Sequence, residues 1–144
     1  AEEPPPRVSV APDSHQGRAR ILIVEDERAL ARALAEELGR VHEVAVAGGA
    51  SHALSLLAEN QFDVILCDLR MPGMSGEVLY GKVEDRNPTQ ARAFIFMTGV
   101  GFGADVERFL AAAGRPVLEK PFSAEAALEA IGKVVAKGRI SGRA

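Results

Sequence analysis

The sequence of 144 residues has little of what several classes of protein require. Its single cysteine, Cys67, lies inside an apolar stretch, which excludes disulfide bonds within the chain and cysteine-based metal sites. No apolar run approaches the roughly 18 residues of a membrane-spanning helix, and no signal peptide is visible at the start. The 17 basic residues are outnumbered by 20 acidic ones, so charge alone would not attract nucleic acid. We therefore expect a cytoplasmic protein that contacts neither membrane nor nucleic acid.

The composition is that of one ordinary globular domain with a tail. Apolar residues make up 47% and charged residues 26% of a chain that is long enough to bury a core. Residues 1–18 hold four of the eight prolines and follow neither a helical nor a strand period, which predicts a linker. We expect one domain over 19–138 and a frayed tail over 139–144. The start at Ala1 rather than Met favours a piece of a longer protein.

From residue 20 onward, short apolar runs alternate with segments of helical period. The apolar runs predict five strands, at 21–24, 44–46, 62–67, 93–97 and 117–118. After each of them, apolar residues recur three and four positions apart, which predicts five helices. The inward-facing residues of these helices would be Leu30, Leu34 and Leu38; Ala53, Leu54, Leu57 and Ala58; Val78, Leu79 and Val83; Val106, Phe109, Leu110 and Ala113; and Ala124, Leu128, Ile131 and Val135. This alternation indicates an α/β protein with a doubly wound parallel sheet and helices on both faces.

The stretch from Phe62 to Gly76, FDVILCDLRMPGMSG, is the one around which we expect a site to form. Its apolar run is typical of a strand buried on both faces, and this strand ends at Asp68. Pro72 and Gly73 then favour a turn. Ligand chemistry in a parallel sheet gathers beyond the carboxyl ends of the strands, where Asp68 would lie. A lone aspartate at such a place more often caps the turn, so the rest of the chain must decide its role.

Other polar side chains follow the neighbouring strands. Glu25 and Asp26 come after the first strand, Thr98 ends the fourth, and Lys120 follows the fifth. If the strands are parallel, these side chains converge with Asp68, and three carboxylates in one place need a cation. Oxygen ligands without histidine or cysteine favour Mg²⁺ or Mn²⁺. With a lysine and a hydroxyl beside it, the set suits phosphoryl transfer onto Asp68.

Four motifs closely resemble the receiver domain of two-component response regulators: ILIVEDE, ILCDLRMPGMSG, FMTG and EKPF. They stand in the family's order and at similar separations, with 42 residues from Asp26 to Asp68, 30 more to Thr98 and 22 more to Lys120. The resemblance covers about residues 19–138. It implies a flavodoxin-like (βα)5 fold, in which a five-stranded parallel sheet lies between two layers of helices.

The resemblance also implies roles for the residues around the phosphoryl group. Asp68 would be the phosphoacceptor, Thr98 would hydrogen-bond a phosphoryl oxygen, and Lys120 would contact the same group. The peptide bond from Lys120 to Pro121 would be cis.

A metal site is implied as well. Asp26 would bind Mg²⁺ (or Mn²⁺) directly and Glu25 through water. Asp68 itself and the backbone carbonyl of Arg70 would complete the protein's share of the ligands.

The resemblance implies partners rather than a free substrate. A histidine kinase or a histidine phosphotransfer domain would donate the phosphoryl group, and the domain would catalyse only its own phosphorylation and dephosphorylation. The proline-rich start favours the receiver of a hybrid histidine kinase; a stand-alone regulator or a receiver from another regulator is the alternative. The last predicted helix ends the chain, so the output partner is expected to act in trans. A weak homodimer through the fourth helix, fifth strand and fifth helix is a further expectation.

One departure from the family's pattern concerns signal relay. Receivers often carry Tyr or Phe three residues before the lysine, where this chain has Val117. Relay through an aromatic rotamer is therefore not expected here.

Three other functions compete with this interpretation. The run from Gly99 to Ala104, GVGFGA, fits a dinucleotide-binding motif, but only one strand follows it, too few to build the second half of such a site. A Mg²⁺-dependent phosphohydrolase would place an acid two residues after its nucleophile, where this chain has Arg70. A receiver without chemistry would lack an acid or the lysine, and neither is missing.

The remaining candidates for chemistry have ordinary interpretations. His15, His42 and His52 lie in the linker or around the second strand and helix, and we expect them at the surface. Cys67 is expected to be a core residue. None of the histidines is expected to be a phosphodonor.

Overall fold

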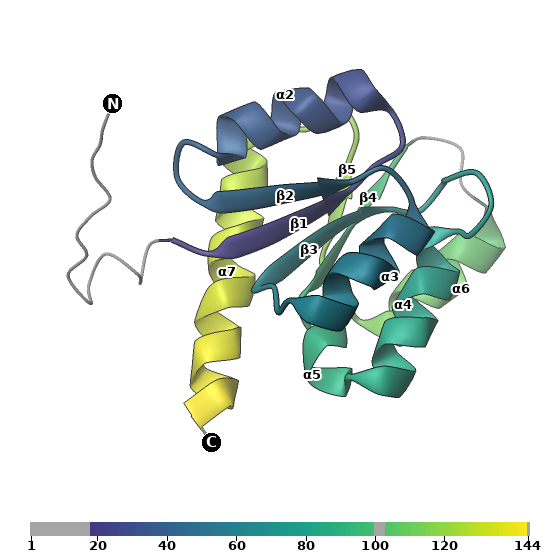
Figure 1. Ribbon diagram of the computed structural model, residues 1–144. Helices are drawn as coiled ribbons and strands as arrows, with labels where there is room; N and C mark the ends of the chain where they lie inside the picture. Colours follow the sequence, from purple (N-terminus) through teal and green to yellow (C-terminus); the bar gives the residue numbers. More distant parts are fainter. Residues whose placement is uncertain (1–17, 100–102, 144) are drawn as a thin grey trace.

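A five-stranded parallel sheet forms the centre of the computed structural model (Figure 1). The structure describes residues 18–99 and 103–143, with side chains as far as residue 138. Its strands lie in the order β2-β1-β3-β4-β5, and every neighbouring pair is parallel. All five strands therefore end at the same side of the sheet, here called the carboxyl edge; the opposite side is the amino edge. The strands are β1 (Arg20–Val24), β2 (Glu43–Ala47), β3 (Val64–Asp68), β4 (Phe94–Thr98) and β5 (Val117–Glu119).

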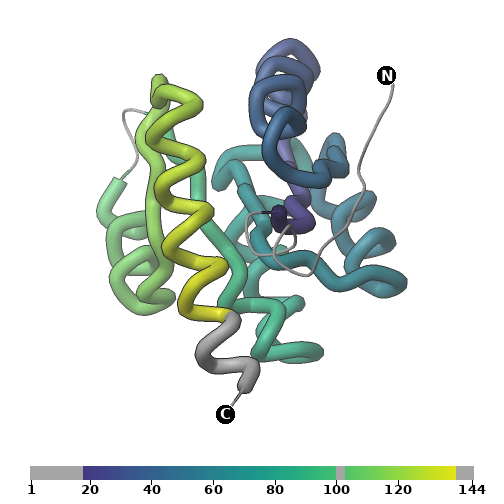
Figure 2. Tube along the Cα trace, turned by 90° about the vertical axis from the view of Figure 1, so that its left-hand side faces the viewer, coloured from purple at the N-terminus to yellow at the C-terminus, as the bar shows by residue number. Residues whose placement is uncertain are grey.

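Helices cover both faces of the sheet, as a doubly wound α/β fold requires. α2 and α7 lie on one face, and α3, α4 and α6 lie on the other (Figure 1 and Figure 2). The predicted flavodoxin-like arrangement of three layers is confirmed. The helices are α2 (Arg28–Leu38), α3 (Ala50–Glu59), α4 (Gly76–Arg86), α5 (Pro88–Ala91), α6 (Ala104–Ala113) and α7 (Ala124–Arg143).

The described chain has six helices where the sequence pattern gives five, because a single turn, α5, follows α4. Asn87 caps this turn by accepting a hydrogen bond from the backbone N–H of Gln90 at 3.2 Å, and Pro88 occupies the first position. Both are helix-start signals, but α5 is too short to show an apolar period.

Alternating residues of the strands feed two cores. In β4, Phe94 and Phe96 face the α3–α4–α6 layer, while Ile95 and Met97 face α2 and α7. The side chains of β3 are buried throughout, which explains why its sequence reads as an unbroken apolar run. The two cores thus hold the central strands, and the residues at their ends, in place from both faces of the sheet.

Two of the predicted inward-facing residues are exposed, Ala58 of α3 and Val78 of α4. Val78 of α4 is 49% exposed, while Leu79 and Val83 are buried as expected. The buried stripe of α4 begins at Gly76 and continues through Leu79, Tyr80 and Val83 at helical spacing. Because the buried stripe starts at a glycine, the apolar pattern alone assigns Val78 to the buried face, one residue before Leu79, where the apolar part of the stripe begins.

At the amino edge, buried polar groups have partners. The side chain of Gln90 accepts from the backbone N–H of Phe62 at 3.1 Å and donates to its carbonyl at 2.7 Å. Nδ1 of His42 accepts from the backbone N–H of Ala19 at 3.0 Å, and His42 is only 8% exposed. The expectation that His42 lies at the surface is therefore wrong, whereas His52 is exposed as predicted and His15 lies outside the described residues.

The two ends of the chain stand differently. Apart from Arg18, the expected linker lies outside the described residues. Helix α7 continues past Val135, the last inward-facing residue given by the sequence pattern, through 139–143 of the expected tail. None of the helices described is both long and apolar enough to cross a membrane.

Candidate functional site

Five polar residues from four strand ends gather at the carboxyl edge. Glu25 and Asp26 follow β1, Asp68 ends β3, Thr98 ends β4, and Lys120 follows β5. The strand order places β1 next to β3, β3 next to β4, and β4 next to β5. The chain reverses its direction of winding between β1 and β3, which is where open parallel sheets form their ligand sites.

Lys120 joins two of the carboxylates. Its Nζ lies 2.9 Å from Oε1 of Glu25 and 3.1 Å from Oδ2 of Asp68. The other oxygens of these carboxylates accept backbone hydrogen bonds: Oε2 of Glu25 from Glu27 and Oδ1 of Asp68 from Arg70, both at 3.2 Å. Both acids are thereby fixed in orientation, and one cation lies between them.

Burial makes the charge of this group costly. Glu25 is 2% and Asp68 6% exposed, whereas Asp26 is exposed to solvent. Desolvation, helped by the nearby charge of Asp68, raises the pKa of Glu25 above its ordinary value although Lys120 and the Glu27 amide oppose it. Desolvation alone would lower the pKa of Lys120, but its hydrogen bonds to Glu25 and Asp68 outweigh burial and raise that pKa. Lys120 is therefore a permanent positive charge at neutral pH.

The carboxylates fit a divalent cation. One oxygen each from Glu25, Asp26 and Asp68 can be chosen so that all three lie within 4.8 Å of one another. Three carboxylates against one lysine leave excess negative charge, and a site of oxygen ligands alone favours Mg²⁺ or Mn²⁺. The expected contribution of the Arg70 carbonyl remains a prediction.

Thr98 has an unusual hydroxyl. The residue is 3% exposed, and among the described residues its Oγ1 alone is a buried side-chain polar atom without a hydrogen-bond partner. Its backbone carbonyl accepts from the N–H of Lys120 at 2.7 Å, so β4 and β5 are joined beside the site. A buried hydroxyl without a partner costs free energy unless a ligand completes it.

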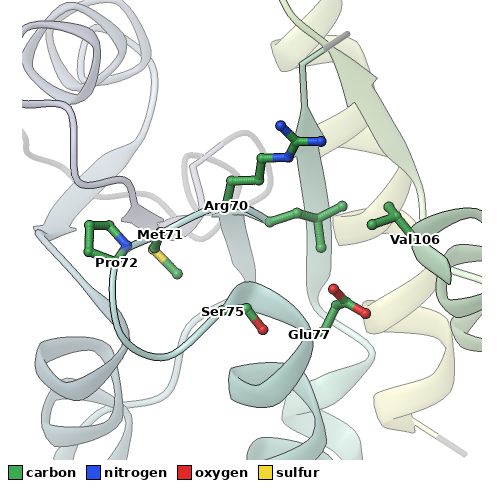
Figure 3. Close-up of a pocket in the computed structure, with 7 residues that line it drawn as sticks. Arg70, Met71, Pro72, Ser75, Glu77 and Val106 are labelled. Carbon is green, nitrogen blue, oxygen red and sulfur yellow. The ribbon is translucent and has the colours of Figure 1, made fainter. Parts of the chain in front are cut away.

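The loop between β3 and α4 forms one wall of the site and of a neighbouring hollow (Figure 3). The hollow has a volume of about 500 Å³, and Figure 3 shows Ser75 and Glu77 at the start of α4, below Arg70. Gly73 has a φ of 80°, a left-handed conformation that glycine adopts without strain, as the turn signal in the sequence indicates. Sequence reasoning had not found this hollow, because its lining comes partly from α6.

Three smaller expectations about the site have outcomes. The peptide bond between Lys120 and Pro121 is cis, as predicted. Cys67 is fully buried in the core, and burial raises the pKa of its thiol far above the ordinary value. Val117 is 39% exposed, and the expectation that no aromatic rotamer relays the signal stays a prediction. The dinucleotide-like run cannot be compared in full, since 100–102 lie outside the described residues.

Comparisons with known proteins agree with this geometry. The family model of the response regulator receiver domain matches residues 21–132. The response regulator protein FleR of Pseudomonas aeruginosa is 34% identical over 117 residues, which cover 80% of this chain and 24% of FleR. The sensor histidine kinase AruS of the same species is 35% identical over 119 residues, which cover 79% of this chain and 12% of AruS. The chain thus spans a quarter or less of the length of these two relatives.

A solved structure shares the whole fold. The crystal structure of a CheY-like response regulator receiver domain protein from Methanospirillum hungatei JF-1 matches with a TM-score of 0.77 at 27% identity. The match covers 85% of this chain and 97% of that one.

Proposed function

This chain belongs to the family of response regulator receiver domains of two-component signalling, and we propose that Asp68 accepts a phosphoryl group from a phosphohistidine. The observation that carries the proposal is the grouping around Asp68. Its Oδ2 lies 3.1 Å from Nζ of Lys120. One of its carboxylate oxygens lies within 4.8 Å of oxygens of Glu25 and Asp26, close enough for one metal ion to bind all three. A capping aspartate would need neither the lysine nor two further acids.

Each group around Asp68 has a part in the transfer. One oxygen of Asp68 forms a bond to phosphorus while the bond from phosphorus to the histidine nitrogen breaks, and the electron pair returns to the imidazole. Lys120 offsets the charge of the phosphoryl oxygens from the β5 side. The hydroxyl of Thr98 donates to one of these oxygens, which satisfies the group that has no partner before transfer.

Glu25 and Asp26 are the residues that would bind the metal ion. Glu25, Asp26 and Asp68, with the backbone carbonyl of Arg70, would hold Mg²⁺ or Mn²⁺, with Asp26 binding directly and Glu25 through water. When bound, the metal ion supplies positive charge toward the phosphoryl oxygens.

The added charge of the phosphoryl group provides the signal. An aspartyl phosphate replaces a single carboxylate charge by a larger one, and the segment from Thr98 to α7 is the part that responds. We place the output surface, and a weak homodimer contact, on α6, β5 and α7. Exposed Val117 lies within that surface.

We infer that the donor is a histidine kinase or a histidine phosphotransfer domain and that an output domain responds to the phosphorylated receiver. The likeness to part of the sensor histidine kinase AruS supports the receiver of a hybrid kinase. The alternatives, a stand-alone regulator or a receiver from another regulator, are supported by the CheY-like structure and by FleR. We place the reaction in the cytoplasm, where ATP is available to charge a kinase histidine.

The proposal is tested by exposing the chain to a small acyl phosphate with Mg²⁺ and measuring its mass. Wild type should gain one phosphoryl group, and the Asp68→Asn variant should gain none. The modification should be lost in hydroxylamine, as an acyl phosphate is and a phosphoserine is not. Unchanged wild-type mass in the presence of Mg²⁺ would overturn the proposal. If wild type is labelled, transfer from a phosphorylated kinase to Asp68 would identify the natural donor.

A further inference from the structure

We propose that Gly76 is a positioning residue for the phosphoacceptor, because the end of β3 occupies the space of a side chain at this residue. A Cβ atom built on Gly76 would lie 2.4 Å from the backbone oxygen of Asp68 and 3.0 Å from Cα of Leu69. It would also lie 3.1 Å from Sγ of Cys67. The inference rests on the proposed role of Asp68 and adds a residue that touches neither metal nor phosphoryl group.

The close approach distinguishes Gly76 from the other described glycines near it. Gly73 in the same loop and Gly81 in the same helix have no atom within 4 Å of a Cβ position. Gly73 is needed for its backbone conformation, and Gly81 for neither reason. Gly76 is thus the point at which the start of α4 touches the end of β3.

A methyl group at Gly76 cannot be accommodated by rotating a side chain. Two of its three closest contacts would be backbone atoms, so either β3 or α4 must move. β3 is fixed between β1 and β4, and the N–H of Leu69 donates to Met97 at 3.2 Å. α4 is fixed by its buried residues Leu79 and Val83. The displacement must therefore fall on the short loop that joins them.

That loop carries the groups that hold Asp68 in place. The N–H of Gly76 donates to the carbonyl of Leu69 at 3.1 Å and closes the loop. Figure 3 shows the loop passing from Arg70 through Pro72 to Ser75 at the start of α4. Within the loop, the N–H of Arg70 donates to Oδ1 of Asp68. A shift of the loop therefore turns the Asp68 carboxylate and moves the Arg70 carbonyl, the expected metal ligand.

The test compares Gly76→Ala with Gly81→Ala, which adds the same methyl group to the same helix in open space. Three quantities are measured at a temperature where both variants are folded. They are the amide proton shift of Arg70 by NMR, the Mg²⁺ dissociation constant by calorimetry, and the rate of labelling by an acyl phosphate.

We expect Gly76→Ala to move the Arg70 amide shift, weaken Mg²⁺ binding roughly tenfold, and slow labelling even at saturating Mg²⁺. Gly81→Ala should leave all three unchanged. If Gly76→Ala alone is too unstable, the double variant Gly76→Ala/Gly81→Ala is compared with Gly81→Ala. Alanine in place of Gly81 favours the helix and so stabilises both proteins.

Two results would contradict the proposal. An Arg70 amide shift unchanged by Gly76→Ala would show that the loop does not move. Loss of stability with normal Mg²⁺ binding in the folded protein would show a merely structural glycine. If wild type is not labelled at all, the proposed function fails, but the amide shift and Mg²⁺ binding still decide the role of Gly76.

Discussion

The two edges of the sheet treat their buried polar groups in opposite ways. At the amino edge, Gln90 and His42 each meet a backbone partner, so burial costs little. At the carboxyl edge, Glu25 and Asp68 share one lysine, and the hydroxyl of Thr98 has no partner. The same strands join both edges, so the difference lies in the side chains rather than in the fold. The carboxylates of Glu25 and Asp68 also have partners, so among the described residues the contrast rests on the unpaired hydroxyl of Thr98, which is free to meet the phosphoryl group proposed for Asp68.

The sharpest way to test this comparison is to remove a satisfied group. Gln90→Leu should lower the free energy of unfolding by about 2–4 kcal/mol, because it leaves the buried N–H and carbonyl of Phe62 without partners. Urea unfolding measures the loss, and labelling of Asp68 in the folded variant should be normal. A loss under about 0.5 kcal/mol would show that this edge does not depend on its hydrogen bonds.

Removal of an unsatisfied group should act in the other direction. Thr98→Val keeps the shape of the side chain and removes the hydroxyl without a partner, so it should raise the free energy of unfolding by about 1 kcal/mol. The same variant should be labelled by an acyl phosphate more slowly than wild type. A less stable Thr98→Val protein would contradict the proposed difference between the edges.

Acid should weaken the amino edge through His42. Burial, followed by the charge of Arg18, lowers the pKa of His42 below 6.5, although Asp63 opposes this. The unfolded chain therefore takes up a proton first as the pH falls. Stability is complete above pH 6.5 and is lost as the pH falls from there through the folded pKa, at a limiting slope of about 1.4 kcal/mol per pH unit.

The control for this slope is His42→Asn, whose side-chain oxygen can still accept from the N–H of Ala19. Urea unfolding is measured from pH 7.5, about a unit above the ordinary histidine pKa, down to pH 5. The free energy of unfolding should depend less steeply on pH in the variant than in wild type. Parallel curves for the two proteins would assign the acid sensitivity to other groups.

The smallest expected change in stability concerns the exposed acid of the site. Asp26→Asn removes one charge from the carboxylate group and should stabilise the protein by a few tenths of a kcal/mol. Mg²⁺ should bind roughly tenfold more weakly or worse. Calorimetry with Mg²⁺ measures the binding, and Glu36→Gln on α2 is a control outside the carboxylate group. Equal Mg²⁺ affinity in wild type and Asp26→Asn would remove Asp26 from the proposed ligands.

The sequence predicts the carboxyl edge better than the amino edge. Asp68 and Thr98 stand directly at the ends of apolar runs, and parallel strands bring such ends together whatever the loops do. The partners of His42 and Gln90 lie 23 and 28 residues away, at the starts of strands, where the sequence shows no recurring signal. Their burial depends on register between strands, which no local pattern reveals.

The error in α4 has a related cause. A pattern of apolar residues does not register a buried stripe that begins with glycine, so the pattern assigns Val78 to the buried face in error. The close approach of Gly76 is likewise a property of two elements in contact and not of the residues between them. What the sequence does show is the need for a turn after Asp68, which Pro72 and Gly73 supply.

The distances along the chain that separate the partners of Lys120 have a consequence for newly made protein. Lys120 meets Glu25 across 95 residues and Asp68 across 52. Contacts of such separation form late in folding, and β5 is the last strand to be synthesised. A chain that is unfinished, or clipped before β5, has Asp68 but lacks Lys120. If Asp68 accepts a phosphoryl group with the help of Lys120, as proposed, efficient phosphorylation would also require that the sheet is complete through β5.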